Sequence, residues 1–162
     1  MSVKFEDNRA RVKIAIEEAI ISTLHECAGE IKSQAQRNTR VDSGQTEGAW
    51  DYVVDNNKYE AVIGNPLENA IWEEFGTGEY ALNKNGRKGY WVYVKGNSSH
   101  SSSSKTYTLE EAKRVVAILR SKGLDAYCTN GKKPSRALYK AYTYSKKKVQ
   151  KQLQKALGKI NE

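Results

Sequence analysis

The sequence predicts an α+β fold, in which a small antiparallel sheet is packed by two long helices, N- and C-terminal, and by shorter helices, with an inserted strand-helix-strand segment. Three observations predict this fold. Apolar residues recur every three or four positions near both ends of the chain, short β-rich segments lie between turn-forming clusters, and glycines stop the helices. The 162 residues suit one domain, so we expect a single domain over residues 1–162.

The first expected element is a long amphipathic helix over about residues 7–38. Its apolar positions fall on one stripe, and charged residues fill the other faces. The stripe must pack against the chain's own sheet or against a helix of a second subunit, and the first alternative is favoured. Its members are Val12, Ile16, Ile20, Leu24, Cys27, Ile31 and Ala35.

A hairpin and a short helix are expected next. Turn-forming residues at 38–44 end the first helix, and β-rich segments at about 49–54 and 59–63 flank a polar loop at 55–58.

Asn65 and Pro66 have the pattern of a helix N-cap followed by proline at the first helical position. A short helix is therefore expected from this point to Glu74, and Gly76 and Gly78 stop it.

The second half of the chain predicts a strand, a loop, a capped helix and another strand. The first strand covers about 90–95, and the serine-rich stretch 97–105 is expected to be a flexible loop. Thr108 and Glu111 have the spacing of a capping box at the start of a helix. The second strand is expected at 126–129.

The last expected element is a second long amphipathic helix over about residues 135–159, with seven lysines mostly away from its apolar side. These lysines are either a solvated surface or a phosphate-contacting surface. The scarcity of arginine, which makes bidentate phosphate contacts, favours the solvated surface, and a DNA-binding module is the alternative function. The candidate basic contact surface comprises Lys132, Lys133, Arg136, Lys140, Lys147 and Lys151.

The charge of the chain is divided unequally. The formal net charge is +8, but residues 1–80 carry −7 and residues 81–162 carry +15. Such a division suits either a nucleic-acid surface or a subunit that docks its basic part on the acidic part of a neighbour.

No catalytic constellation is visible, so we expect a protein that is not an enzyme and has no cofactor and no metal. Cys27 and Cys128 lie far apart without metal-binding spacing, which predicts free thiols. His25 and Cys27 diverge on a helix, and His100 lies in the serine-rich stretch, where no preorganised base is expected. Neither a signal peptide nor a membrane span is expected.

Three separated pieces of the sequence resemble one bacteriophage family. They are Arg40-Val41-Asp42-Ser43-Gly44, then Ala61 to Asn65 followed by Ala70-Ile71-Trp72-Glu73-Glu74-Phe75-Gly76-Thr77-Gly78, and finally Gly131 to Pro134 with Leu138 and Ala141. The family is the minor tail-component, or tail-completion, family of long-tailed phages. The positions that the resemblance marks for assembly are Asp42, Gly44, Gly64, Ala70, Trp72, Glu74, Phe75, Gly76, Thr77, Gly78 and Pro134.

The resemblance implies a structural protein of the head-tail junction, encoded by an active phage or a prophage. Such a protein is made in the cytoplasm of the bacterial host and resides in the tail or neck of the virion. The resemblance also implies binding to connector, neck and tail-tube proteins and self-association as a ring in the virion, with a monomer in solution as the alternative. The excess of positive charge adds the expectation of a non-specific contact with genomic DNA. Residues 97–128 look like an insertion relative to shorter members.

Physical chemistry gives the signature a candidate role. We expect Trp72 and Phe75 to anchor the short helix to the sheet, while Glu73, Glu74 and Glu79 form an exposed acidic corner. A basic segment of a neighbouring subunit would meet that corner in a head-to-tail contact.

A second resemblance covers residues 90–129, whose strand, loop, capped helix and strand are similar to one repeat of a peptidoglycan-binding sporulation-related domain, which is about half of such a domain. A peptidoglycan-binding module is the minor alternative.

Overall fold

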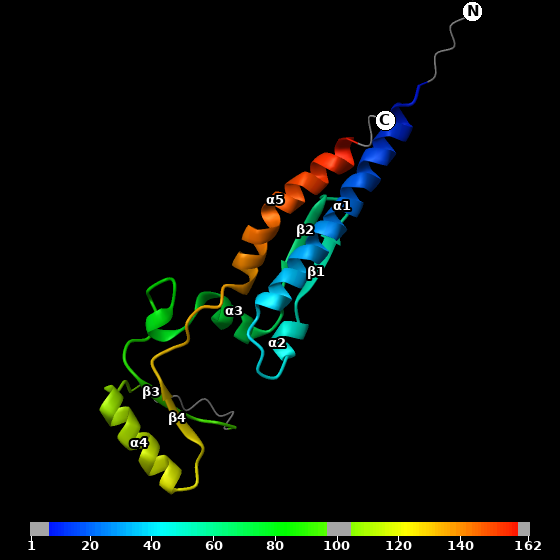
Figure 1. Cartoon of the computed structure of the whole chain (residues 1–162). Coiled ribbons are helices and arrows are strands. Elements are labelled where there is room, and N and C mark those ends of the chain that lie inside the picture. Colours follow the sequence, from blue (N-terminus) through cyan, green and yellow to red (C-terminus); the bar gives the residue numbers. More distant parts are fainter. Residues whose placement is uncertain (1–6, 97–104, 159–162) are drawn as a thin grey trace, which may run out of the picture. The chain divides into compact units, whose positions relative to one another are not determined.

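The computed structural model describes residues 7–96 and 105–158, which fall into two compact units. Unit 1 comprises Met1–Leu67 and Ala137–Glu162, and unit 2 comprises Glu68–Arg136. The α+β class is confirmed, with a long helix near each end of the chain and strands between them (Figure 1).

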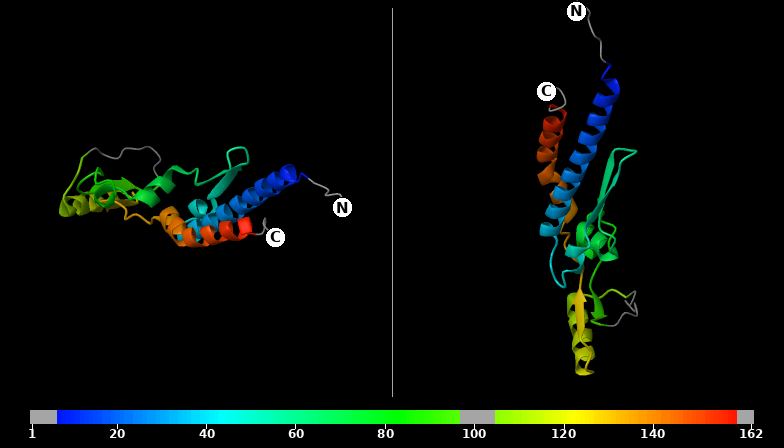
Figure 2. Two further views of the ribbon diagram at one scale, coloured as in Figure 1. Left: turned by 90° about the horizontal axis from the view of Figure 1, so that it is seen from above. Right: turned by 90° about the vertical axis from the view of Figure 1, so that its right-hand side faces the viewer.

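Unit 1 consists mainly of two long helices and a hairpin. Helices α1 (Arg9–Asn38) and α5 (Ala137–Gly158) lie side by side, and the hairpin of β1 (Asp51–Asp55) and β2 (Glu60–Gly64) runs along another side of α1 (Figure 2). The short helix α2 (Gln45–Gly48) lies between α1 and the hairpin in sequence. The long helices and the hairpin that the sequence predicts are therefore confirmed.

Small side chains make the contact between α1 and α5. Ala35 of α1 forms one buried cluster with Ala137 and Ala141 of α5, and Ser145, one turn further along, is fully buried. Because the spacing of packed helices depends on the side chains between them, alanine and serine let the two backbones approach closely.

Trp50 covers the end of this cluster. Its indole Nε1 donates to Thr39 Oγ1 at 2.8 Å, and the Thr39 hydroxyl donates to the Ala35 carbonyl at 2.8 Å. The indole ring is buried, and its N–H has the hydrogen-bond acceptor that a buried tryptophan usually finds.

Alternate residues of the hairpin point to its two opposite faces. Val53 and Val62 are cross-strand partners and are both exposed, whereas Tyr52 and Ile63, the next pair, are half-buried on the face toward α1. The carboxylate of Asp55 accepts hydrogen bonds from two amides of the loop, which fixes the turn.

Unit 2 has its own core and its own sheet. Strands β3 (Trp91–Val94) and β4 (Ala126–Thr129) pair antiparallel, and helix α4 (Leu109–Ser121) covers one face of the pair. The unit also contains α3 (Glu68–Phe75) and a 3-10 turn at Gly78–Tyr80. Buried Val92, Ala112, Val116 and Ala126 form the core.

The predicted capping box is confirmed. The Thr108 hydroxyl accepts from the Glu111 amide at 3.4 Å, and the Glu111 carboxylate accepts from the Thr108 amide at 2.9 Å.

Two expectations from the sequence require correction. Within residues 7–96 and 105–158 the strands form two two-stranded sheets instead of one small sheet, because β1 pairs with β2 and β3 pairs with β4. Helix α3 begins at Glu68 rather than after Asn65. The Asn65 side chain accepts from the Leu67 amide at 3.0 Å, which makes a turn ahead of the helix instead of a cap.

Some expectations lie outside what the structure describes. The serine-rich stretch 97–105 falls outside the described residues except for its last residue, and so do His100 and Lys159. The single domain over 1–162, with its insertion at 97–128, stays a prediction.

We predict that Ser145→Ala stabilises the protein by about 1 kcal/mol. Among the described residues, the buried Ser145 hydroxyl has no hydrogen-bond partner. Removing such a group relieves a desolvation cost of about 1–3 kcal/mol, and alanine is the better helix former. Urea unfolding measures the change.

Ala141→Ser is the matched control, because it adds a hydroxyl one turn earlier in the same contact. It is expected to destabilise by a similar amount. A Ser145→Ala variant less stable than the wild type would contradict the assignment of this hydroxyl as unsatisfied.

Candidate functional site

Two distant segments that carry the family signature cross each other in unit 2, and we call residues 73–79 with 130–135 the clasp. The Thr77 amide donates to the Lys132 carbonyl at 2.9 Å, and the Lys132 amide donates to the Thr77 hydroxyl at 3.0 Å. The Glu79 amide donates to the Asn130 carbonyl at 2.9 Å. The crossing is thus a short backbone ladder between residues about 55 positions apart.

The other end of the clasp is anchored on Glu73. Its carbonyl accepts from the Ser135 amide at 2.7 Å and from the Ser135 hydroxyl at 2.9 Å. Its carboxylate is ion-paired with the Lys132 ammonium, and its side chain is only 15% exposed. The partner of Glu73 is therefore a lysine of the same unit.

Glycine is required where the two backbones meet. A Cβ on Gly78, where φ is +60°, would lie 2.2 Å from the Asn130 carbonyl oxygen. A Cβ on Gly131 would lie 2.1 Å from the Thr77 carbonyl oxygen, and one on Gly76 would lie 2.8 Å from Pro134 Cδ. These distances are shorter than any van der Waals contact, so the signature glycines permit the crossing itself.

The clasp turns α3 so that its apolar side faces outward. Ile71, Trp72 and Phe75 are 59%, 50% and 50% exposed, and we call these three residues the α3 apolar face. Ala70 on the opposite side is buried, and Glu73 is mostly enclosed. Exposed large apolar side chains gathered on one short helix are a feature of interaction surfaces.

The expectation that Trp72 and Phe75 anchor this helix to the sheet is therefore wrong. The expectation that Glu73 and Glu74 are exposed is also wrong, since both are partly buried. The physical reason is the pair of bonds from Glu73 to Lys132 and Ser135, which holds the carboxylate side inward. Glu79 is exposed, as expected, although its carboxylate accepts from Asn130 Nδ2 at 2.9 Å.

The remaining signature residues lie in unit 1. Asp42 is exposed in the turn after α1, Gly44 has φ +79° just before α2, and Gly64 ends β2. The structure therefore joins Gly76, Thr77, Gly78 and Pro134 in the clasp, and assigns Asp42, Gly44 and Gly64 to the other unit. A role of these residues in assembly stays a prediction.

The candidate basic residues divide in the same way. In unit 2, Lys132 pairs with Glu73, and the Lys133 ammonium lies 5.6 Å from the centre of the Tyr80 ring, while Arg136 adopts a positive φ.

Lys140, Lys147 and Lys151 are exposed on α5 of unit 1. Tyr144 lies in line with them and is 68% exposed. The spacing i, i+4, i+7, i+11 places all four side chains on one row of the helix, which we call the lysine-tyrosine row. Sequence analysis missed Tyr144, although this spacing was visible.

Opposite charges also meet inside unit 1. The Lys148 ammonium lies 3.0 Å from a Glu30 carboxylate oxygen, joining α5 to α1. This contact and a hydrogen bond from Gln34 lower the pKa of Glu30 below its ordinary value. Part of the charge division along the chain is thus satisfied within one copy.

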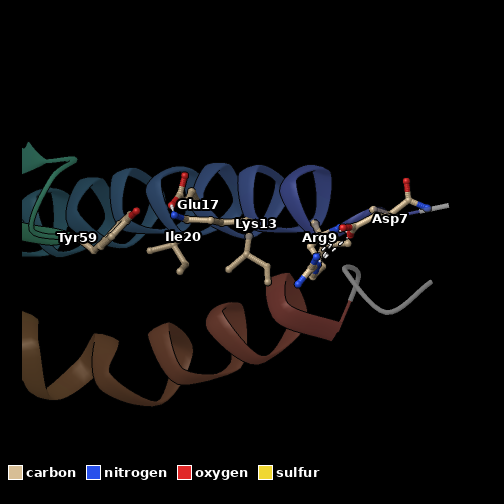
Figure 3. Close-up of a pocket in the computed structure, with 9 residues that line it drawn as sticks. Asp7, Arg9, Lys13, Glu17, Ile20 and Tyr59 are labelled. Carbon is tan, nitrogen blue, oxygen red and sulfur yellow. Dashed lines mark hydrogen bonds and ion pairs between the residues drawn. The ribbon is translucent and has the colours of Figure 1, made fainter.

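An open groove of about 740 Å³ follows the first turns of α1. Figure 3 shows Ile20 pointing from α1 toward the side where α5 runs, with Tyr59 near one end and the Asp7–Arg9 ion pair near the other. Val12, at the start of the predicted apolar stripe, is exposed. Ile16 and Ile20, the next members of the stripe, are half-buried along this groove, while the later members Cys27 and Ala35 are buried.

In residues 7–96 and 105–158, no three His, Cys, Asp or Glu side chains gather to hold a metal ion. Within the same residues, no helix is both long and apolar enough to span a bilayer.

Comparison with known proteins gives a family match. The model of the HK97-gp10-like family, described as "Bacteriophage HK97-gp10, putative tail-component", matches residues 4–94, which is more than half of the chain. The match includes α1, the hairpin, α3 and the first segment of the clasp, but not residues 130–135. No curated protein and no solved structure matches the chain.

We predict that Gly78→Ala disrupts the clasp. A residue with a β-carbon loses about 1–2 kcal/mol of stability in the left-handed backbone conformation of this position. The clash of that β-carbon with the Asn130 carbonyl costs about 1–3 kcal/mol more. Hydrogen exchange followed by mass spectrometry should show faster exchange in residues 126–135.

Gly123→Ala is the matched control, because Gly123 also has a positive φ of +79° in unit 2 but has no atom within 4 Å of the added Cβ. It should show only the smaller backbone cost. Equal effects of the two substitutions would contradict a role for close backbone approach.

Proposed function

We propose that this chain, which belongs to the HK97-gp10-like family of bacteriophage tail components, is a structural protein of the junction between phage head and tail. It completes the tail or joins it to the head. Its work is to bind other proteins, and it catalyses no reaction and uses no cofactor. Its place is the tail or neck of the virion, after synthesis in the host cytoplasm.

The observation that carries this proposal is the α3 apolar face. A soluble helix of eight residues ordinarily turns its apolar side inward. Here the clasp encloses Glu73 and presents Ile71, Trp72 and Phe75 to the outside. Tryptophan is among the residues that most often dominate the binding energy of protein interfaces.

The core of the protein supports the same conclusion. Among the described residues, the buried apolar side chains are mostly alanines, with Trp50 as the largest. Many large apolar side chains remain at the surface instead, including Val53, Val62 and Ile118. Such a surface suits a subunit that gains stability by contact with connector, neck or tail-tube proteins and with further copies of itself.

We predict that Trp72→Ser prevents head-tail joining without unfolding the protein. Loss of a central aromatic anchor costs about 2 kcal/mol or more, which is about thirty-fold in affinity. The measurement is complementation of a phage lacking this gene, with free tails and joined particles counted by electron microscopy.

Ile118→Ser is the matched control, because Ile118 is an equally exposed apolar residue of unit 2 on α4. It should complement normally. Joined, infectious virions from the phage that lacks the gene would refute the proposed function.

A DNA-binding module is the second candidate, and the lysine-tyrosine row is the observation that favours it. Lys140, Lys147 and Lys151 present three exposed charges along one side of α5. Non-specific attraction to phosphate requires only such charges.

Salt titration against random duplex DNA separates the two candidates. The assembly function predicts no appreciable binding at physiological salt. A dissociation constant near micromolar would favour the DNA-binding module, provided that replacing the three lysines by glutamine makes the logarithmic salt slope shallower by about three.

A further inference from the structure

We infer that the α3 apolar face of one copy docks on the lysine-tyrosine row of α5 in a second copy. The inference rests on the proposed function, since it specifies how the subunit would associate with itself. Both surfaces consist of exposed residues. One surface comprises Ile71, Trp72 and Phe75, and the other comprises Lys140, Tyr144, Lys147 and Lys151.

Negative charge borders the α3 apolar face where the helix begins. Glu68, the first residue of α3, is exposed and lies on the same side as Ile71, Trp72 and Phe75, because these positions have the spacing i, i+3, i+4 and i+7. Glu73 is withdrawn into its ion pair with Lys132. The surface that remains is apolar, with a carboxylate at its start.

Positive charge borders Tyr144 on both sides along α5. Lys140 lies one turn before Tyr144, and Lys147 and Lys151 lie one and two turns after it. Among the described residues, none of these three lysines forms an ion pair. These lysines, on both sides of the Tyr144 ring, are therefore available to pair with a carboxylate of a second copy.

The dimensions of the two surfaces agree. Glu68 lies four residues before Trp72 on α3, and Lys140 lies four residues before Tyr144 on α5, so on each helix the charge is about 6 Å from the aromatic residue along the axis. Tyr144 can then contact the indole of Trp72, while lysines reach the Glu68 carboxylate or the aromatic faces.

Each copy carries both halves of this contact, α3 in unit 2 and α5 in unit 1. The contact is therefore head-to-tail, and repetition of it closes into a ring when the rotation permits. The two surfaces comprise three and four residues, fewer than the roughly 20–30 residues per side of a stable interface, so a single contact is weak and a closed set is stronger.

Disulfide trapping tests the contact, because it records weak associations. In a Cys128→Ser background, which removes the half-exposed native thiol and leaves only buried Cys27, one full chain carries Phe75→Cys and a size-tagged chain carries Tyr144→Cys. After mixing and mild oxidation, a disulfide-linked heterodimer is expected. Glu68→Lys in the first chain should lower its yield several-fold.

The control pairs Ile118→Cys, an exposed position on α4, with Tyr144→Cys. Heterodimer no more abundant than in this control would overturn the inference. If Trp72→Ser also abolished head-tail joining in that case, the α3 apolar face would dock on another tail protein, and the proposed function would stand without the inferred contact.

Discussion

The close approach of two backbones at Gly78 and Gly131 is the constraint on which unit 2 depends. The amides and carbonyls of residues 77–79 and 130–132 pair across this crossing only because neither glycine carries a side chain. The crossing in turn fixes Glu73 against Lys132 and Ser135. The orientation of α3, and with it the exposure of Trp72, follows from that attachment.

Local patterns predicted most elements of the fold. The three- and four-residue spacing gave α1 and α5, and the Thr108–Glu111 pair gave the start of α4, because these signals act within one or two turns of chain. The division of the strands into two sheets was not predictable in this way. Pairing of β3 with β4 joins residues more than thirty positions apart, and no local pattern specifies such a partner.

The candidate site was predicted by position but not by arrangement. The sequence marked Gly76, Thr77, Gly78 and Pro134, and the structure brings them together. The sequence did not reveal that Glu73 turns inward. The inward side of an eight-residue helix is predicted from the polarity of its residues, and glutamate is usually exposed, but here an ion pair with Lys132 holds Glu73 inside. Tyr144 has the same helical spacing as Lys140 and Lys147, so its place on that side of α5 was predictable, whereas its 68% exposure depends on how α5 packs on α1.

Unit 2 leaves and rejoins the rest of the chain at neighbouring points, since Ser135 is hydrogen-bonded to Glu73. A segment whose two ends are hydrogen-bonded to each other can be lengthened, shortened or replaced while those hydrogen bonds remain. The segment between β3 and β4 can therefore differ in length without redesign of the helical pair in unit 1.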